Sequence, residues 1–264
     1  MAIFTQSFMV NAWISGTMIA LLSSFIGFFI ILRSSTFSAH VIPEIGFSGG
    51  AGAVFFSINP LWGLAIFSIG GAFMIKWLTN REKNDTASGL TLITLLGVGA
   101  LFLSLSNQYA SGAYALLFGQ ILGVSDTQTY ITIIFCFLCI ALLFICYRPI
   151  LLTSISLDLA KSRGVKVALI DSLFLLTIAL AATVIVPIVG TLLCFSLLIV
   201  PNAASVYLAS EPKKVITLSL IISLISIWFA IILGYITGWP IGFFVSIIST
   251  TFYLLSRCLH FIKD

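Results

Sequence analysis

One histidine and one glutamate in an otherwise apolar stretch, His40 and Glu44, have the chemistry to bind a metal ion. They are four residues apart, so in a helix both side chains lie on one face. An imidazole nitrogen and a carboxylate oxygen are ligands for Zn²⁺ and, with further oxygens, for Mn²⁺ or Fe²⁺. In a two-fold dimer the pair becomes two histidines and two glutamates around one axis. The alternative is a His–Glu hydrogen bond that stabilises a helix interface without a ligand.

The composition decides which elements position this pair. Of the 264 residues, 60% are hydrophobic and 8% are charged, whereas a soluble domain carries ~25% charged residues. This predicts a polytopic membrane protein and excludes a soluble catalytic domain, a nucleotide-binding domain and a nucleic-acid partner. Backbone exposed to lipid must satisfy its hydrogen bonds internally, and the apolar runs are too long for strands. The predicted fold is therefore an all-α helix bundle.

Hydropathy predicts about nine (eight to nine) transmembrane helices in a single transmembrane domain over residues 1–264. The predicted spans are 9–32, 37–57, 60–79, 87–106, 128–147, 168–187, 190–209, 214–236 and 240–257. Residues 112–124 are apolar but too short to cross a bilayer, so we expect a re-entrant or interfacial helix there.

The basic residues predict the orientation. All 12 Lys and Arg residues follow the odd-numbered spans, on the same side of the predicted membrane. Because positive charge is retained in the cytoplasm, we expect the N-terminus outside and the C-terminus in the cytoplasm of a bacterial inner or plasma membrane. Asp171 lies one turn inside the sixth span, near this basic face, where it could contact a basic loop.

The longest loop on the basic side contains a candidate short helix at about 154–165. Ser154 or Ser156 can cap its N-terminus, and Asp158 in the first turn is favoured by the helix dipole. Gly164 can adopt the left-handed conformation that ends a helix. Such a segment is either a surface helix on the lipid headgroups or a lever that docks into a cytoplasmic partner.

Small residues follow the His–Glu pair along the second span. Gly46, Gly49, Gly50 and Ala53 have the small-x-x-x-small spacing that lets membrane helices approach closely. We predict a helix-packing role for them. A narrow hydrated passage beside the same helix interface is compatible with that role.

Two longer segments resemble a known family. Leu157–Val165 (LDLAKSRGV) and Val189–Ser205 (VGTLLCFSLLIVPNAAS) are similar to the cytoplasmic and membrane motifs of the membrane permease of zinc/manganese/iron-type metal ABC importers. Leu117–Ser125 (LFGQILGVS) and Arg33 at the end of the first span also match. From Arg33 to Ser205 these segments are distributed over most of the chain, in the order in which the family has them.

The resemblance implies a homodimeric permease driven by two cytoplasmic ABC ATPase subunits and supplied by an external metal-binding protein. The divalent metal (Zn, Mn or Fe) would be a substrate and no cofactor would be bound permanently. The chain lacks a G-x-x-x-x-G-K-[ST] loop, so it is expected to be a transport subunit and not an enzyme. The residues that the resemblance assigns to ATPase coupling are Leu157, Asp158, Ala160, Arg163 and Gly164.

The metal-site residues depart from the family pattern, which has an aspartate and, four residues on, a histidine. Counted from Arg33, those two positions hold Ala39 and Pro43. The acid and imidazole recur one residue later in reverse order, as His40 and Glu44. A shift of one residue rotates the face by ~100°, although Pro43 can kink the helix and reset it. The His40–Glu44 site is therefore a hypothesis from the residues themselves.

Two other functions fit the composition. One is an ABC permease for a metal chelate or a cobalamin-like cofactor. The other is an ion-coupled secondary carrier that uses Glu44 as its relay, although such carriers often have repeated halves with broken helices and no internal repeat is evident here. Co-purification with an ATPase would distinguish the two classes.

Overall fold

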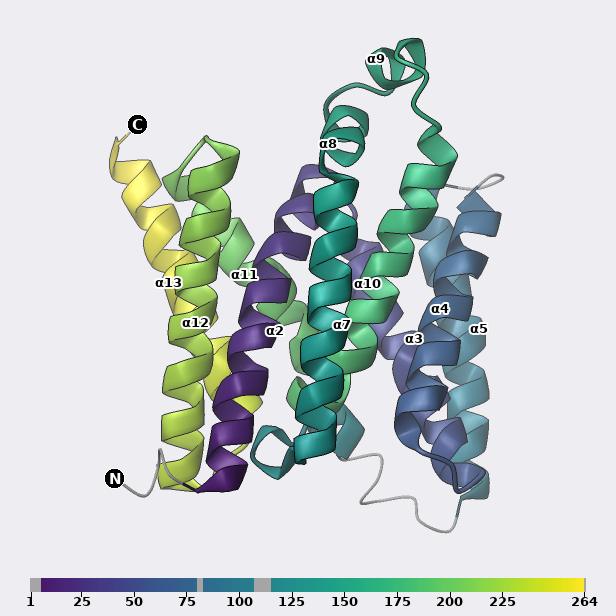
Figure 1. Ribbon diagram of the computed structural model, residues 1–264, viewed down its shortest axis with the longest axis vertical. Coiled ribbons are helices and arrows are strands. Elements are labelled where there is room, and N and C mark those ends of the chain that lie inside the picture. The colour runs from purple at the N-terminus through teal and green to yellow at the C-terminus, as the bar shows by residue number, and fades with distance from the viewer. Residues whose placement is uncertain (1–5, 80–82, 107–114, 264) are drawn as a thin grey trace.

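The computed structural model describes residues 6–79, 83–106 and 115–263, and within these ranges the regular structure is entirely helical. Nine long helices run roughly along one axis (Figure 1), which confirms the predicted all-α bundle. They are α2 (Ser7–Leu32), α3 (Thr36–Phe55), α4 (Pro60–Thr79), α5 (Asn84–Leu105), α7 (Asp126–Ile145), α10 (Val167–Val189), α11 (Thr191–Leu208), α12 (Pro212–Thr237) and α13 (Ile241–Lys263). Eight of them are long and apolar enough to cross a membrane.

The helix outside that group of eight is α3, which has 20 residues and carries the His–Glu pair. His40, Glu44 and four glycines lower its hydropathy, yet it packs between α4, α5, α10 and α11. Most of its residues are buried by these neighbours, whereas His40 and Glu44 remain partly exposed. The helix continues through Pro43 without a break.

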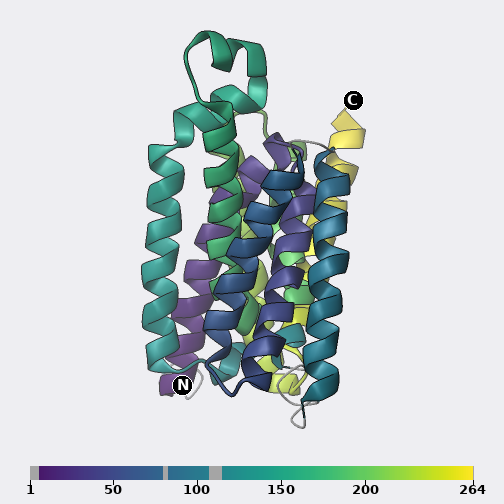
Figure 2. The ribbon, with the colours of Figure 1, turned by 90° about the vertical axis from the view of Figure 1, so that its right-hand side faces the viewer.

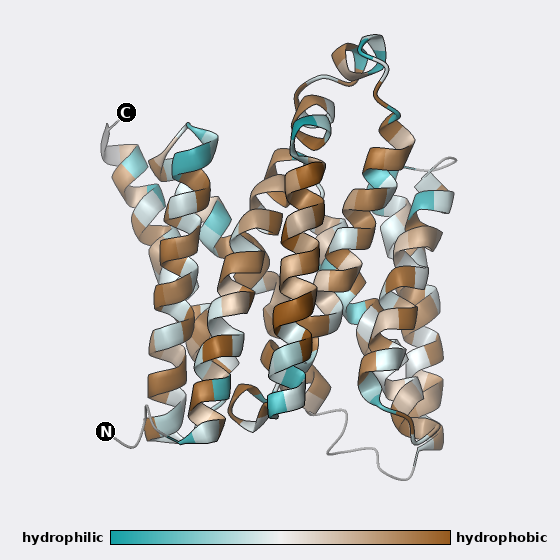
Figure 3. Cartoon of the chain, in the orientation of Figure 1, coloured by the Kyte–Doolittle hydropathy of each residue, from teal (hydrophilic) through white to brown (hydrophobic). Residues whose placement is uncertain are grey.

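Burial distinguishes the centre of the bundle from its rim. In α2 and α10, 67% of the most apolar window is buried, against 17% in α5 and 22% in α13. Hydrophobic residues cover the length of the helices, and hydrophilic ones gather toward their ends (Figure 3). This is the distribution expected of a bundle whose rim faces lipid.

The central helix α2 crosses α11 at a glycine. A Cβ at Gly27 would lie 2.0 Å from the backbone oxygen of Leu198 and 2.1 Å from Nδ2 of Asn202, so no larger residue fits. The buried Asn202 amide donates to the backbone oxygen of Ser23, at 3.2 Å. Asn202 belongs to the Val189–Ser205 segment, so this part of the motif joins two helices.

Two glycines join the segment before α7 to the turn between α10 and α11. Residues 115–118 are helical and a 3-10 turn, η1, covers Ile121–Gly123, while residues 112–114 of the predicted 112–124 helix lie outside the described ranges. Gly119 (φ 74°) and Gly190 (φ 95°) face each other, and a Cβ on either would lie 2.4 Å from the opposite backbone. Both the positive φ and the close approach require glycine.

The two termini lie at opposite ends of the bundle (Figure 1). We call the end that contains the C-terminus the basic end, because the described Lys and Arg residues all lie at helix ends or connections there. Two short helices, α8 (Tyr147–Ile155) and α9 (Leu157–Ser162), project from it beyond the other helices (Figures 1 and 2).

Candidate functional site

The structure brings His40 and Glu44 together on α3. Nε2 of His40 lies 3.3 Å from Oε1 of Glu44, and the two side chains are 38% and 23% exposed. The imidazole packs edge-on against Phe195 of α11, with the ring centroids 4.8 Å apart. Its other nitrogen, Nδ1, is buried and has no hydrogen-bond partner in the described part of the chain. The facing atoms of the pair, Nε2 and Oε1, are both of types that bind divalent cations.

The described part of one copy offers this pair and no larger cluster of metal-ligating side chains. Among the described residues, no group of three or more His, Cys, Asp or Glu side chains gathers around one point. A tetrahedral or octahedral ion needs four to six ligands. Two ligands per chain are what a site shared across a two-fold axis requires.

The small residues of α3 lie against its neighbours on several sides. A Cβ at Gly49 would lie 2.1 Å from the backbone oxygen of Gly63 on α4, and one at Gly46 would lie 2.5 Å from Oγ of Ser68. A Cβ at Gly50 would meet Leu116 at 2.8 Å, and Ala53 contacts Gly63. Backbones this close determine the position of α3, and hence of the His–Glu pair, relative to α4.

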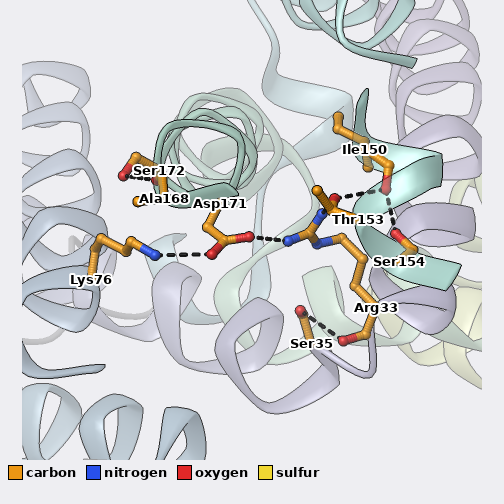
Figure 4. A network of polar contacts seen from close by, with 9 residues as sticks. All are labelled: Arg33, Ser35, Lys76, Ile150, Thr153, Ser154, Ala168, Asp171 and Ser172. Atoms are coloured by element: carbon orange, nitrogen blue, oxygen red, sulfur yellow. Dashed lines mark hydrogen bonds and ion pairs between the residues drawn. The ribbon is translucent and has the colours of Figure 1, made fainter. Parts of the chain in front are cut away.

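A second polar site occupies the basic end. Asp171 of α10 forms ion pairs with two basic side chains. Its Oδ1 accepts from Nη2 of Arg33, and its Oδ2 accepts from Nζ of Lys76, at 3.0 Å (Figure 4). Nη1 of Arg33 donates to Oγ1 of Thr153 on α8, at 2.8 Å. The guanidinium lies 5.0 Å from the ring centroid of Phe174. We call Arg33, Lys76, Asp171 and Thr153 the ionic cluster.

An open cavity of about 520 Å³ lies beside the ionic cluster. The α8–α9 junction forms one wall of it, through Ile155, Ser156 and Leu157. The first turn of α3 forms another wall, through Ser35 and Ser38. The cluster therefore lies between the transmembrane helices and the projecting segment.

The projecting segment is two helices. Ser156 is extended (φ −154°, ψ 117°) and its hydroxyl accepts from the backbone N–H of Leu159, so Ser156 and not Ser154 caps α9. Gly164 (φ 75°) has the left-handed conformation expected after the helix end. Helix α9 is thus Leu157–Ser162, shorter than the segment expected at 154–165, because the extended Ser156 separates it from α8.

The residues expected to couple to an ATPase divide by burial. Leu157, Asp158, Arg163 and Gly164 are exposed, whereas Ala160 is fully buried. Leu159, which the family motif does not single out, is 44% exposed beside them. The outer surface of α9 therefore presents two leucines flanked by an acid and bases, while Ala160 packs the helix onto the rest of the chain.

Sequence reasoning located Asp171 at the basic face but did not identify its partners. They are side chains at the ends of α2 and α4, not of a loop. One feature of the sequence could have identified these partners. Arg33 and Lys76 are basic residues at the ends of predicted spans, on the same face as the acidic Asp171. No pattern in the sequence indicates that Thr153 belongs to the same cluster.

A bundle with a lipid-facing apolar rim and a few charged side chains near its ends defines a multi-pass membrane protein of the cell membrane. The sequence comparisons narrow this class. A model of the ABC 3 transport family matches residues 5–260, so the chain belongs to that family. This confirms the resemblance read from the motifs.

Several relatives match almost the whole chain. The manganese import system permease protein ScaB of Streptococcus parasanguinis is 29% identical over 94% of this chain and 89% of its own length. The high-affinity zinc uptake system membrane protein ZnuB of Buchnera aphidicola is 30% identical over 84% of this chain and 86% of its own. Among solved structures, PsaBC of Streptococcus pneumoniae in complex with a Fab matches with a TM-score of 0.86 and 26% identity, covering 97% of this chain and 92% of that one.

Proposed function

We propose that this chain is the permease subunit of an ATP-driven importer of divalent transition metal ions. The observation that carries the proposal is the match of nearly the whole chain to permeases named for manganese import and zinc uptake. The His40–Glu44 pair on the protein-enclosed helix α3 supplies ligands of the right kind.

We propose that the cargo site forms where two copies of the chain meet. Each copy contributes the imidazole of His40 and the carboxylate of Glu44. Two nitrogens and two oxygens suit Zn²⁺, and Mn²⁺ or Fe²⁺ would add water or further oxygens. The cation would replace the internal Nε2–Oε1 contact of 3.3 Å.

The basic end faces the cytoplasm in this proposal, because positive charge is retained there. Helix α9 then projects into the cytoplasm, where its exposed Leu157, Asp158 and Arg163 contact an ABC ATPase subunit. An external metal-binding protein delivers the ion to the opposite end. ATP hydrolysis takes place on the ATPase and alternates the side from which the cargo site is open.

The test is uptake of radioactive manganese and zinc into proteoliposomes that contain the permease, its ATPase and its binding protein. We expect His40→Ala and Glu44→Gln each to lower uptake at least about tenfold, because each change removes the same ligand from both copies. Matched controls are His260→Ala near the C-terminus and Glu211→Gln, whose side chain is exposed and pairs with Lys214. Both controls should transport normally.

Each outcome decides between specific alternatives. Normal uptake by both His40→Ala and Glu44→Gln would remove the pair from the path. Uptake that needs an ion gradient and no ATPase would identify a secondary carrier instead. Competition by unlabelled Zn²⁺, Mn²⁺ and Fe²⁺ ranks the cargo ions.

A further inference from the structure

The ionic cluster joins four helices through two side chains. Asp171 connects α10 to Arg33 at the end of α2 and to Lys76 of α4, and Arg33 continues the connection to Thr153 of α8 (Figure 4). Arg33 is therefore the residue through which the α8–α9 segment is bonded to the transmembrane core. None of these residues touches the His40–Glu44 pair.

The cluster is held in one arrangement. The side chain of Arg33 is 11% exposed, lies against the ring of Phe174 and uses two nitrogens on two different acceptors. A planar guanidinium with its nitrogens directed in this way does not reorient without losing bonds. A displacement of α8 must therefore either move Arg33 and α10 or break the hydrogen bond to Thr153.

The rest of the attachment of α8 combines apolar packing with a ring contact, in which Tyr147 lies edge-on to Phe29 of α2 with the ring centroids 5.6 Å apart. The two buried residues of α8 are Ile150 and Thr153. An apolar contact such as that of Ile150 tolerates sliding, because hydrophobic burial has no preferred direction. The hydrogen bond from Nη1 of Arg33 to Oγ1 of Thr153, at 2.8 Å, adds a directional polar bond between α8 and the core.

We propose that Arg33, Asp171 and Thr153 are positioning residues for transport, forming a joint that transmits displacement of α9 to α2 and α10. This rests on the proposed function, in which an ATPase moves α9. Only Ser156 separates α9 from α8, so a pull on α9 reaches Thr153 directly. Through Arg33 and Asp171 the pull then reaches α2 and α10, the most buried of the eight helices that are apolar enough to cross a membrane.

Helix α8 offers a matched pair of hydroxyls for the test. The hydroxyls of Thr153 and Ser154 both donate to the backbone oxygen of Ile150, at 3.0 and 2.6 Å, but only Thr153 also accepts from Arg33. Thr153→Val keeps the shape and removes the acceptor, and Thr153→Ser restores it. Ser154→Ala removes the neighbouring hydroxyl without touching Arg33.

The readouts are ATPase co-purification, ATP hydrolysis, and metal ions transported per ATP in proteoliposomes. We expect Thr153→Val to keep the ATPase bound and hydrolysing, while metal transported per ATP falls about tenfold, as for the loss of one charge-assisted hydrogen bond. Thr153→Ser and Ser154→Ala should match the parent chain. ATPase co-purification and ATP hydrolysis at the level of the parent chain establish that each variant is folded.

If Thr153→Val transports a number of metal ions per ATP within twofold of the parent value, the proposed joint is rejected. Loss of ATPase binding by that variant also overturns it, because Thr153 would then serve docking and not transmission. If no ATPase co-purifies with the parent chain, the proposed function itself fails, and the joint fails with it.

Discussion

The two polar sites of this protein differ in how they are built. The His40–Glu44 pair comes from one helix, four residues apart, and leaves Nδ1 of His40 without a partner among the described residues. The ionic cluster draws Arg33, Lys76 and Asp171 from three helices, and a carboxylate serves two cations. A local, partly exposed pair held by one 3.3 Å contact can accept an ion at little structural cost. A satisfied cluster between helices holds the fold together, and changes to it should first affect stability.

The largest effect should follow from Asp171→Asn. This change leaves Arg33 and Lys76 facing each other without their shared carboxylate, and removing one partner of a mostly buried ion pair costs about 3 kcal/mol. Unfolding of the purified protein in mixed detergent micelles measures the loss. Ser172→Ala is the neighbouring control, since its hydroxyl bonds only within α10, to the Ala168 backbone oxygen. A loss below about 1 kcal/mol would show that the cluster is not the stability element described here.

The next effect should come from Gly49→Ala, which tests whether packing, and not polar bonding, positions the His–Glu helix. The added Cβ would lie 2.1 Å from the backbone oxygen of Gly63, so α3 and α4 must separate, at a cost of about 2 kcal/mol. The same detergent titration measures it. Gly70→Ala on α4 is the control, because nothing lies within 4 Å of the added atom. If Gly49→Ala and Gly70→Ala lower the free energy of unfolding equally, close packing against α4 does not position α3.

A smaller effect is expected from Lys76→Met. The remaining Arg33–Asp171 pair is neutral, so only one partly exposed ion pair is lost, worth about 1 kcal/mol. Combined with Lys76→Met, the Asp171→Asn change should cost less than it does alone, because it then leaves one uncompensated cation and not two. Simple additivity of the two losses would show that Lys76 and Asp171 are not energetically coupled.

How well the sequence predicts each part depends on how local the interaction is. Composition alone requires helices, and the predicted spans 9–32 and 214–236 agree with α2 (Ser7–Leu32) and α12 (Pro212–Thr237) within two residues. The His40–Glu44 contact follows from helical spacing, so it was predicted before any tertiary structure. Asp171 was placed at the basic face for the same reason, since its depth depends only on the start of its own helix.

Interactions between distant segments were not predictable in this way. Arg33 and Asp171 are 138 residues apart, and nothing in either segment states that α2 and α10 are neighbours. Gly119 and Gly190 stand out only as residues of two motifs, and their mutual contact needs the tertiary fold. The division of the 148–167 loop into α8 and α9 depended on which of two suitable serines caps the second helix, a choice that local propensity does not settle.

The smallest change in stability should come from Glu44→Gln, and it separates the two sites most clearly. An (i, i+4) pair on one helix contributes ~0.2–0.5 kcal/mol, and a glutamine oxygen can still accept from Nε2 of His40 at a distance near 3.3 Å. We therefore expect the free energy of unfolding in mixed micelles to change by less than about 0.5 kcal/mol.

The side chain of Glu44 is 23% exposed, slightly less than the 27% of Asp171, so exposure alone does not explain a difference between Glu44→Gln and Asp171→Asn. If Glu44→Gln destabilises the protein as much as Asp171→Asn does, the His–Glu pair is itself a structural element. A stable Glu44→Gln protein that no longer carries metal would instead assign the carboxylate to the cargo.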